Sequence, residues 1–90
     1  MRLGAKEVAT IKRAIRSYDA NATIYLFGSR IDDSKKGGDI DLLVESSCIT
    51  FKDILKIKTE LFLELGDRKI DIVYQKNPFF EQMKKKAIKL

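Results

Sequence analysis

Residues 26–45 read LFGSRIDDSKKGGDIDLLVE, in which two apolar segments flank a polar loop. The first apolar segment ends at Gly28 and Ser29, and the second carries Asp39 and Asp41 two residues apart. Side chains alternate along a strand, so these two carboxylates share one face and the apolar residues of the segment share the other. Burying carboxylates in a strand costs free energy unless a positive charge or hydrogen-bond donors compensate their negative charge.

A third carboxylate repeats this pattern in the segment KIDIVY, residues 69–74. Asp71 and Val73 share one face of this predicted strand, and the remaining apolar residues share the other. If the apolar faces pack against helices, Asp39, Asp41 and Asp71 meet on the opposite face and repel one another unless a cation neutralises them. Mg²⁺ takes few protein carboxylates and completes its shell with water and substrate phosphates. Alternation alone leaves a second interpretation open, in which these are ordinary solvated residues.

The turn at Gly28 and Ser29 separates the first predicted strand from SRIDD, residues 29–33, which predict a short helix. Helix N-termini bind phosphate through free N–H groups, and glycine permits close approach to the backbone. A plain serine-capped turn would use the same residues. The loop also holds Arg30, Lys35 and Lys36, which are either a clamp for a triphosphate or solvated charges.

Two longer amphipathic helices are predicted over residues 5–18 and 50–66. In the second, Thr50 and Asp53 match a capping box and Gly66 matches a C-terminal cap. Its expected apolar stripe consists of Phe51, Ile54, Leu55, Leu61, Phe62 and Leu65.

Strands are expected at residues 22–27, 39–45 and 69–74, and residues 78–90 predict a final helix. This order favours an α+β fold, a small mixed sheet with helices mainly on one face. The basic tail is either a docking surface or an amphipathic helix that covers the sheet.

Composition narrows the possible functions without selecting one. The chain has 90 residues, one domain at most, and its net charge of +5 favours anionic partners. The absence of histidine removes the commonest general base and zinc ligand. The single cysteine, Cys48, excludes an internal disulfide and is expected to be a small buried or semi-buried residue. No bilayer-spanning apolar run or signal-peptide core occurs, so a cytoplasmic protein with no membrane partner is expected.

Four segments together resemble the signature of the DNA polymerase β-like nucleotidyltransferase superfamily. They are LFGSR, the nine residues from Arg30 to Gly38, DIDLLV and KIDIVY. The resemblance spans roughly residues 22–74. Within the superfamily, residues 1–90 are similar to a single minimal nucleotidyltransferase (MNT) domain. MNT proteins are typically paired with helical HEPN proteins, and several pairs are toxin–antitoxin systems. The resemblance implies an antitoxin that transfers AMP from ATP to a tyrosine of a HEPN RNase toxin.

The resemblance also implies the roles of individual residues. The glycine–serine turn would hold the triphosphate of ATP, two carboxylates would bind a pair of Mg²⁺ ions, and the third would be a metal ligand or the general base. The implied site residues are Gly28, Ser29 and Arg30 for the nucleotide and Asp39, Asp41 and Asp71 for the metal and the chemistry. Many MNT members carry Ala-Arg-Gly after Gly-Ser-Arg, whereas this chain has IDDSKKGG, so the resemblance does not extend to the rest of the phosphate clamp.

Two other functions are compatible with parts of the sequence. The same fold would also neutralise a HEPN toxin by stoichiometric binding, with weak or no catalysis. A nucleic-acid-binding module would rest on positive charge alone, and the basic residues are dispersed with no recognition motif. Direct nucleic-acid binding is therefore not expected.

Overall fold

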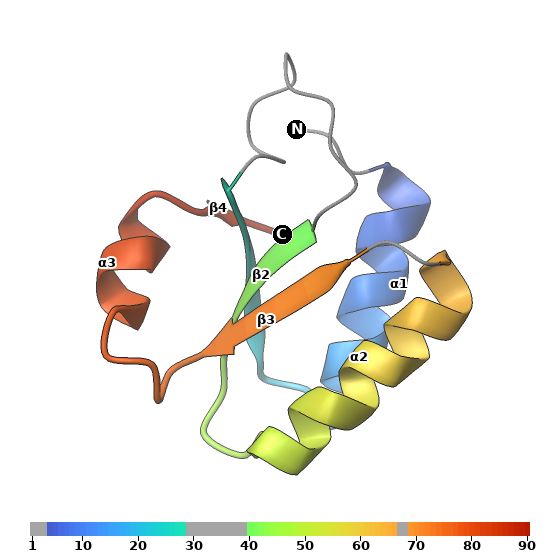
Figure 1. Ribbon diagram of the computed structural model, residues 1–90, viewed down its shortest axis with the longest axis horizontal. Helices are drawn as coiled ribbons and strands as arrows, with labels where there is room; N and C mark the ends of the chain where they lie inside the picture. Colours follow the sequence, from blue (N-terminus) through green and yellow to red (C-terminus); the bar gives the residue numbers. More distant parts are fainter. Residues whose placement is uncertain (1–3, 29–39, 67–68) are drawn as a thin grey trace.

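The computed structural model describes residues 4–28, 40–66 and 69–90, which form a four-stranded sheet with helices on both faces (Figure 1). The strand order is β3-β2-β1-β4; β1 runs antiparallel to β2 and β4, and β2 runs parallel to β3. This mixed sheet confirms the predicted α+β class. The elements in chain order are α1 (Ala5–Arg16), β1 (Thr23–Phe27), β2 (Ile40–Glu45), α2 (Phe51–Leu65), β3 (Ile70–Tyr74), α3 (Phe80–Lys85) and β4 (Ile88–Lys89).

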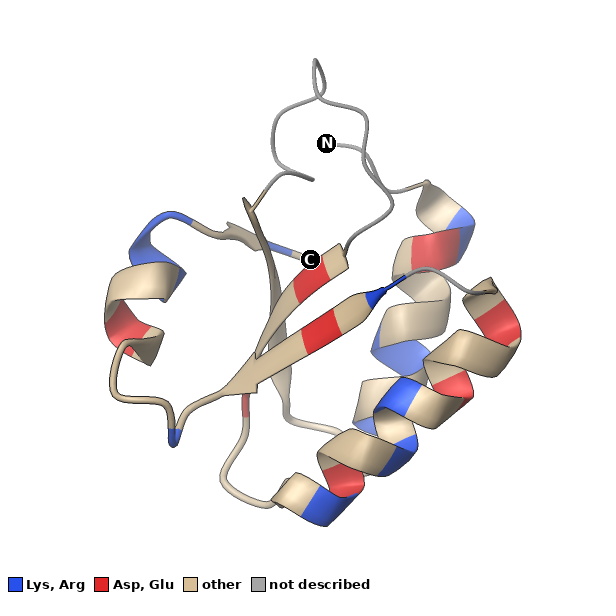
Figure 2. Ribbon diagram, in the orientation of Figure 1, with Lys and Arg blue, Asp and Glu red and all other residues tan. Residues whose placement is uncertain are grey.

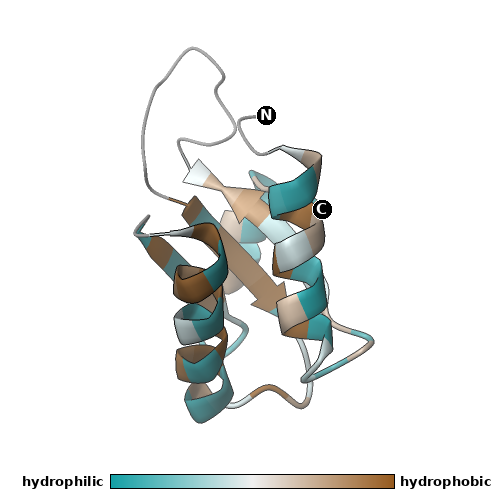
Figure 3. Ribbon diagram, turned by 90° about the vertical axis from the view of Figure 1, so that its right-hand side faces the viewer, coloured by the Kyte–Doolittle hydropathy of each residue, from teal (hydrophilic) through white to brown (hydrophobic). Residues whose placement is uncertain are grey.

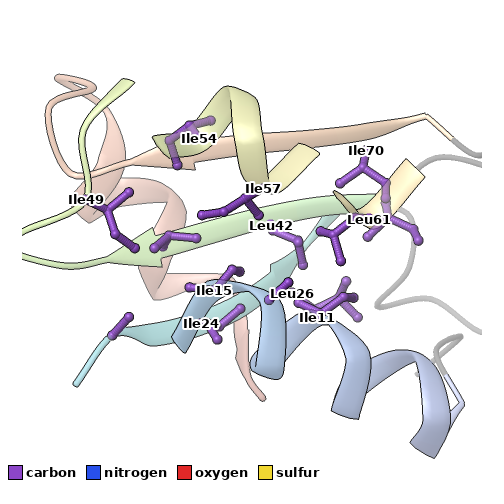
Figure 4. Close-up of a cluster of buried hydrophobic side chains, with 14 residues drawn as sticks. Ile11, Ile15, Ile24, Leu26, Leu42, Ile49, Ile54, Ile57, Leu61 and Ile70 are labelled. Atoms are coloured by element: carbon purple, nitrogen blue, oxygen red, sulfur yellow. The ribbon is translucent and has the colours of Figure 1, made fainter. Parts of the chain in front are cut away.

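The main core lies between the sheet and the pair α1 and α2, which lie in front of the strands in Figure 3. Ile11 and Ile15 of α1 and Ile57 and Leu61 of α2 pack side by side against this one face of the strands (Figure 4). The strand residues of this core alternate in sequence, as the period of two requires. They are Ile24, Leu26, Ile40, Leu42, Val44 and Ile70.

Helix α2 begins and ends as predicted, but its buried stripe is different. Thr50 and Asp53 form the capping box, and Gly66 lies at the C-terminal cap with φ +90°. Ile57, which the prediction left out, is fully buried. The predicted stripe was wrong at three positions, because α2 carries two apolar stripes and only the one containing Ile57 faces the sheet. The three exposed residues are Phe51, Leu55 and Phe62.

The final helix is shorter than predicted and lies on the face of the sheet opposite α1 and α2 (Figure 1). It ends at Lys85, because the chain then returns to the sheet and β4 pairs with β1. Phe80 of α3 is buried and lies outside the main core, as does Leu43 on this second face. The helix is also held by Lys84, whose ammonium group lies 3.1 Å from Glu45 Oε2.

The cysteine prediction was wrong, because Cys48 is exposed. It lies in the turn between β2 and α2, where the Ser46 hydroxyl accepts the backbone N–H groups of Cys48 and Ile49. Ile49 takes the buried position of this turn. The predicted short helix at residues 29–33 lies outside the described residues. Within the described ranges, none of the helices has the length and apolar character needed to cross a membrane.

Candidate active site

The parallel pairing of β2 and β3 brings two of the predicted carboxylates together. Asp41 and Asp71 are partners in the register, so they occupy neighbouring positions on the sheet. Figure 2 shows these acidic positions side by side on the two strands. Their neighbours Ile40, Leu42 and Ile70 belong to the core with α1 and α2, so both carboxylates belong to the opposite face. Adjacent strands lie about 4.8 Å apart, which is a distance that one cation can bridge.

The glycine turn lies directly against one of these carboxylates. Gly28 follows β1 with φ +85°, a left-handed conformation that L side chains rarely adopt. A Cβ atom built on Gly28 would lie 2.6 Å from Oδ2 of Asp41, closer than real Cβ contacts occur. Two independent constraints therefore require glycine here, namely the backbone angle and the nearby carboxylate. The turn and the carboxylate form one unit, in which a ligand on the backbone of Gly28 would also approach Asp41.

The charges of this unit favour a cation. Like charges on directly paired strand positions destabilise a sheet, and the paired positions here are Asp41 and Asp71. Asp71 has the ammonium group of Lys69 at 3.8 Å, and its side chain is 44% exposed. A surface ion pair of this length contributes little to stability. Carboxylate oxygens are the ligands that Mg²⁺ prefers, so Asp41 and Asp71 fit a divalent cation that also contacts substrate phosphates.

The structure thus brings together Gly28, Asp41 and Asp71 from the six predicted site residues. The other three, Ser29, Arg30 and Asp39, lie outside the described residues. In the described part of the chain there is no group of three or more His, Cys, Asp or Glu side chains that would hold a metal ion by themselves.

The same face carries features that sequence reasoning did not identify. Phe27 is the register partner of Asp41 on β1, and together with α3 it lines a pocket of about 400 Å³. Tyr25, two residues earlier, donates a hydrogen bond to Glu45 Oε1 at 3.2 Å. Lys84 lies 6.0 Å from the centre of the Tyr25 ring. The alternation of β1 would have assigned Tyr25 and Phe27 to this face, but only the fold shows that α3 covers it.

The Tyr25–Glu45–Lys84 cluster has shifted acid–base properties. Burial, together with the negative charge of Glu45 and the hydrogen bond to it, raises the pKa of Tyr25. The hydrogen bond to Glu45 raises the pKa of Lys84 as well. At neutral pH the tyrosine is therefore neutral and the lysine charged, which is the state that joins α3 to β1 and β2.

A comparison with protein families identifies the chain. The model of the family described as "Polymerase beta, Nucleotidyltransferase" matches residues 9–90. The search of curated proteins returned no match. The matched range includes the helices and strands of the described residues, except the start of α1, and it includes the carboxylate pair and the glycine turn. The chain belongs to the polymerase β-like nucleotidyltransferase family, whose members are transferases that generally use a divalent metal and a nucleoside triphosphate.

Proposed function

We propose that this protein is a Mg²⁺-dependent adenylyltransferase that transfers AMP from ATP to a partner HEPN toxin. The acceptor is a hydroxyl group of the toxin, and we assign it to a tyrosine. The transfer makes this protein an antitoxin. The observation that carries this proposal is the contact between Gly28 and Asp41 beside Asp71. It joins a place where a phosphate can approach the backbone to a pair of oxygen ligands for a cation.

The described residues have distinct roles in this proposal. Asp41 holds the cation, and the absence of a side chain at Gly28 lets this carboxylate lie against the backbone of the turn where the triphosphate binds. When bound, Mg²⁺ neutralises the charge of the phosphates and of the leaving pyrophosphate. The acceptor oxygen forms a bond to the α-phosphorus of ATP while the bond from that phosphorus to pyrophosphate breaks. Asp71 accepts the proton of the acceptor hydroxyl, since the chain has no histidine to do so.

The position of Asp71 supports an acceptor that comes from another protein. β3 is an edge strand of the described sheet, and the Asp71 side chain is 44% exposed. A side chain of a partner can therefore approach Asp71 from outside the sheet. Asp41, in contrast, lies on β2 between β1 and β3. The acceptor and the donor would accordingly reach the carboxylate pair from different sides.

The test is the intact mass of the candidate HEPN partner after incubation with this protein, ATP and Mg²⁺. We expect a gain of one or more AMP units, and we expect Asp41→Asn to abolish it. Glu60→Gln, which removes a carboxylate from α2 on the other face, is the matched control and should leave the gain unchanged. An unmodified partner, or full modification by Asp41→Asn, would refute the proposed activity.

A second candidate, neutralisation by stoichiometric binding, is favoured by the outer surface of α2. Four large apolar side chains are exposed there: Phe51 at 59%, Leu55 at 49%, Phe62 at 54% and Leu63 at 75%. Helical periodicity places Lys52, Lys56 and Lys58 beside them and the acidic residues of α2 toward the other flank, so this surface suits an acidic partner. If toxin neutralisation survives Asp41→Asn but is lost in Leu63→Asp, binding and not catalysis is the antitoxic function.

A further inference from the structure

An open pocket of about 400 Å³ lies between the end of β1 and α3, on the same face of the sheet as the carboxylate pair. Its lining residues are Phe27, Phe79, Gln82, Met83, Lys85 and Lys86. The lining residues of α3 and its two caps recur at intervals of three and four positions, so they lie on one face of the helix. Phe80 and Lys84 point elsewhere, because the first is buried and the second contacts Glu45. The pocket is therefore a separate feature from the contacts that hold α3 in place.

One residue of the pocket, Phe27, lies next to the site in the register of the sheet. Phe27 pairs with Asp41, and Asp41 pairs with Asp71, so the three residues form a row across β1, β2 and β3. Gly28 follows Phe27 directly, at the end of the row where the triphosphate is expected. A ligand whose phosphates lie at Gly28 and Asp41 thus has the pocket on its β1 side and Asp71 on its β3 side.

The chemistry of the lining defines the ligand. Phe27, Phe79 and Met83 provide flat or polarisable apolar surfaces, and Phe79 is 61% exposed. Lys85 and Lys86 also line the pocket and add positive charge, and Gln82 offers both a donor and an acceptor. Aromatic side chains bind nucleobases by stacking. A planar ring with polar edges, attached to an anion, satisfies all of these groups.

We infer that this pocket binds the nucleobase of the donor nucleotide, with Met83 of α3 and the N-cap residue Phe79 as the principal contacts. The inference rests on the proposed function, since it assumes a nucleoside triphosphate at Gly28 and Asp41. The acceptor is the alternative occupant, but the proton-accepting Asp71 lies on the far side of Asp41 from the pocket. The β1 side is therefore left for the donor. Helix α3 and the tail that follows it thereby become part of the nucleotide site.

The experiment compares two ligands and two variants by isothermal titration calorimetry in the presence of Mg²⁺. ATP carries a base and inorganic tripolyphosphate does not. The double variant Phe79→Ala/Met83→Ala removes the stacking surface without touching the buried Phe80. Asn21→Ala, which shortens an exposed side chain in the turn before β1, at the opposite end of that strand from Gly28, is the control.

We expect ATP to bind roughly tenfold or more weakly to the double variant, with tripolyphosphate affinity unchanged, and Asn21→Ala to match the wild type. Unchanged ATP affinity in the double variant would overturn the inference, and so would an equal loss for both ligands. If ATP affinity is kept but the KM for the protein acceptor rises, the pocket holds the acceptor and the inference is wrong. If the wild-type protein binds ATP and does not transfer AMP, the proposed function fails. The affinities of the variants for ATP and for tripolyphosphate still test the pocket assignment in that case.

Discussion

Replacing Gly28 with alanine tests the contact on which the proposed site depends. The substitution adds a Cβ atom at a residue with φ +85°, and this atom would lie 2.6 Å from Oδ2 of Asp41. Even a tight Cβ contact needs about 3.0 Å, so the carboxylate has to move or rotate away. The backbone term alone costs about 1–2 kcal/mol, because the left-handed region is unfavourable for a residue with a side chain.

The chain offers a matched control in Gly66. Its φ is +90°, but a Cβ atom built there meets nothing within 4 Å. Gly66→Ala therefore carries the backbone cost without disturbing a carboxylate. Both variants should lose about 1–2 kcal/mol of unfolding free energy in urea, which corresponds to roughly 4–8 °C in Tm for each kcal/mol in a domain of this size.

Only Gly28→Ala should also lose ligand binding and transfer. At an ATP concentration of about 100 Kd, ligand binding stabilises a protein by about 2.7 kcal/mol, and tenfold weaker binding removes roughly half of this. We expect that loss in Gly28→Ala, together with a fall in transfer rate on the order of 100-fold, as expected when a catalytic group is misplaced by about 1 Å. Thermal unfolding with and without Mg²⁺ and ATP measures the binding term. Equal ATP-induced stabilisation in the two alanine variants would refute the role assigned to the Gly28–Asp41 contact.

Three further predictions follow from the two faces of the sheet. Asp71→Asn should abolish AMP transfer without lowering the Tm of the ligand-free protein, because it removes a like charge from the position paired with Asp41. A fall in Tm would contradict the repulsion between these two carboxylates. The pKa values of Tyr25 and Lys84 are raised above their ordinary values of 10.0 and 10.5. These two residues therefore contribute fully to stability below about pH 10, and this contribution is lost as the pH rises further. Urea midpoints between pH 8 and 11 should fall less steeply for Tyr25→Phe than for the wild type, and parallel curves would remove this linkage. Phe80→Ala should cost about 3–5 kcal/mol in urea unfolding, because Phe80 is 1% exposed, and a cost below 1 kcal/mol would mean that α3 is not packed through this ring.

The sequence predicted the strands well because their alternation is nearly complete. In β2 and β3 each carboxylate is flanked by apolar residues, and only one assignment of faces buries those residues. The pairing of Asp41 with Asp71 needs the strand order and the register, neither of which can be read from a single strand. Alternation therefore predicted only a shared face, and the register shows that Asp41 and Asp71 occupy neighbouring positions on it.

The helices were harder to predict because apolar spacing alone does not identify the buried face. Helix α2 has apolar residues around much of its circumference, so the sequence offered two stripes and the prediction mixed them. Burial of Ile57 in place of Phe62 depends on where α1 and the sheet lie. The tail posed a different problem, because Ile88 and Lys89 form a strand only through pairing with β1, more than sixty residues earlier in the chain. Such a distant pairing leaves no local signal.

The edge position of β3 has a consequence for self-association. An edge strand presents backbone groups that can pair with a strand of another molecule, and proteins commonly protect such edges with charged side chains. In this protein Lys69 and Asp71 stand at the beginning of the edge strand, and Asp71 already lies beside Asp41. A second copy that added its own β3 in register would bring further carboxylates into the same row. The carboxylate that we propose as the proton acceptor therefore also discourages the sheet from extending into a fibre.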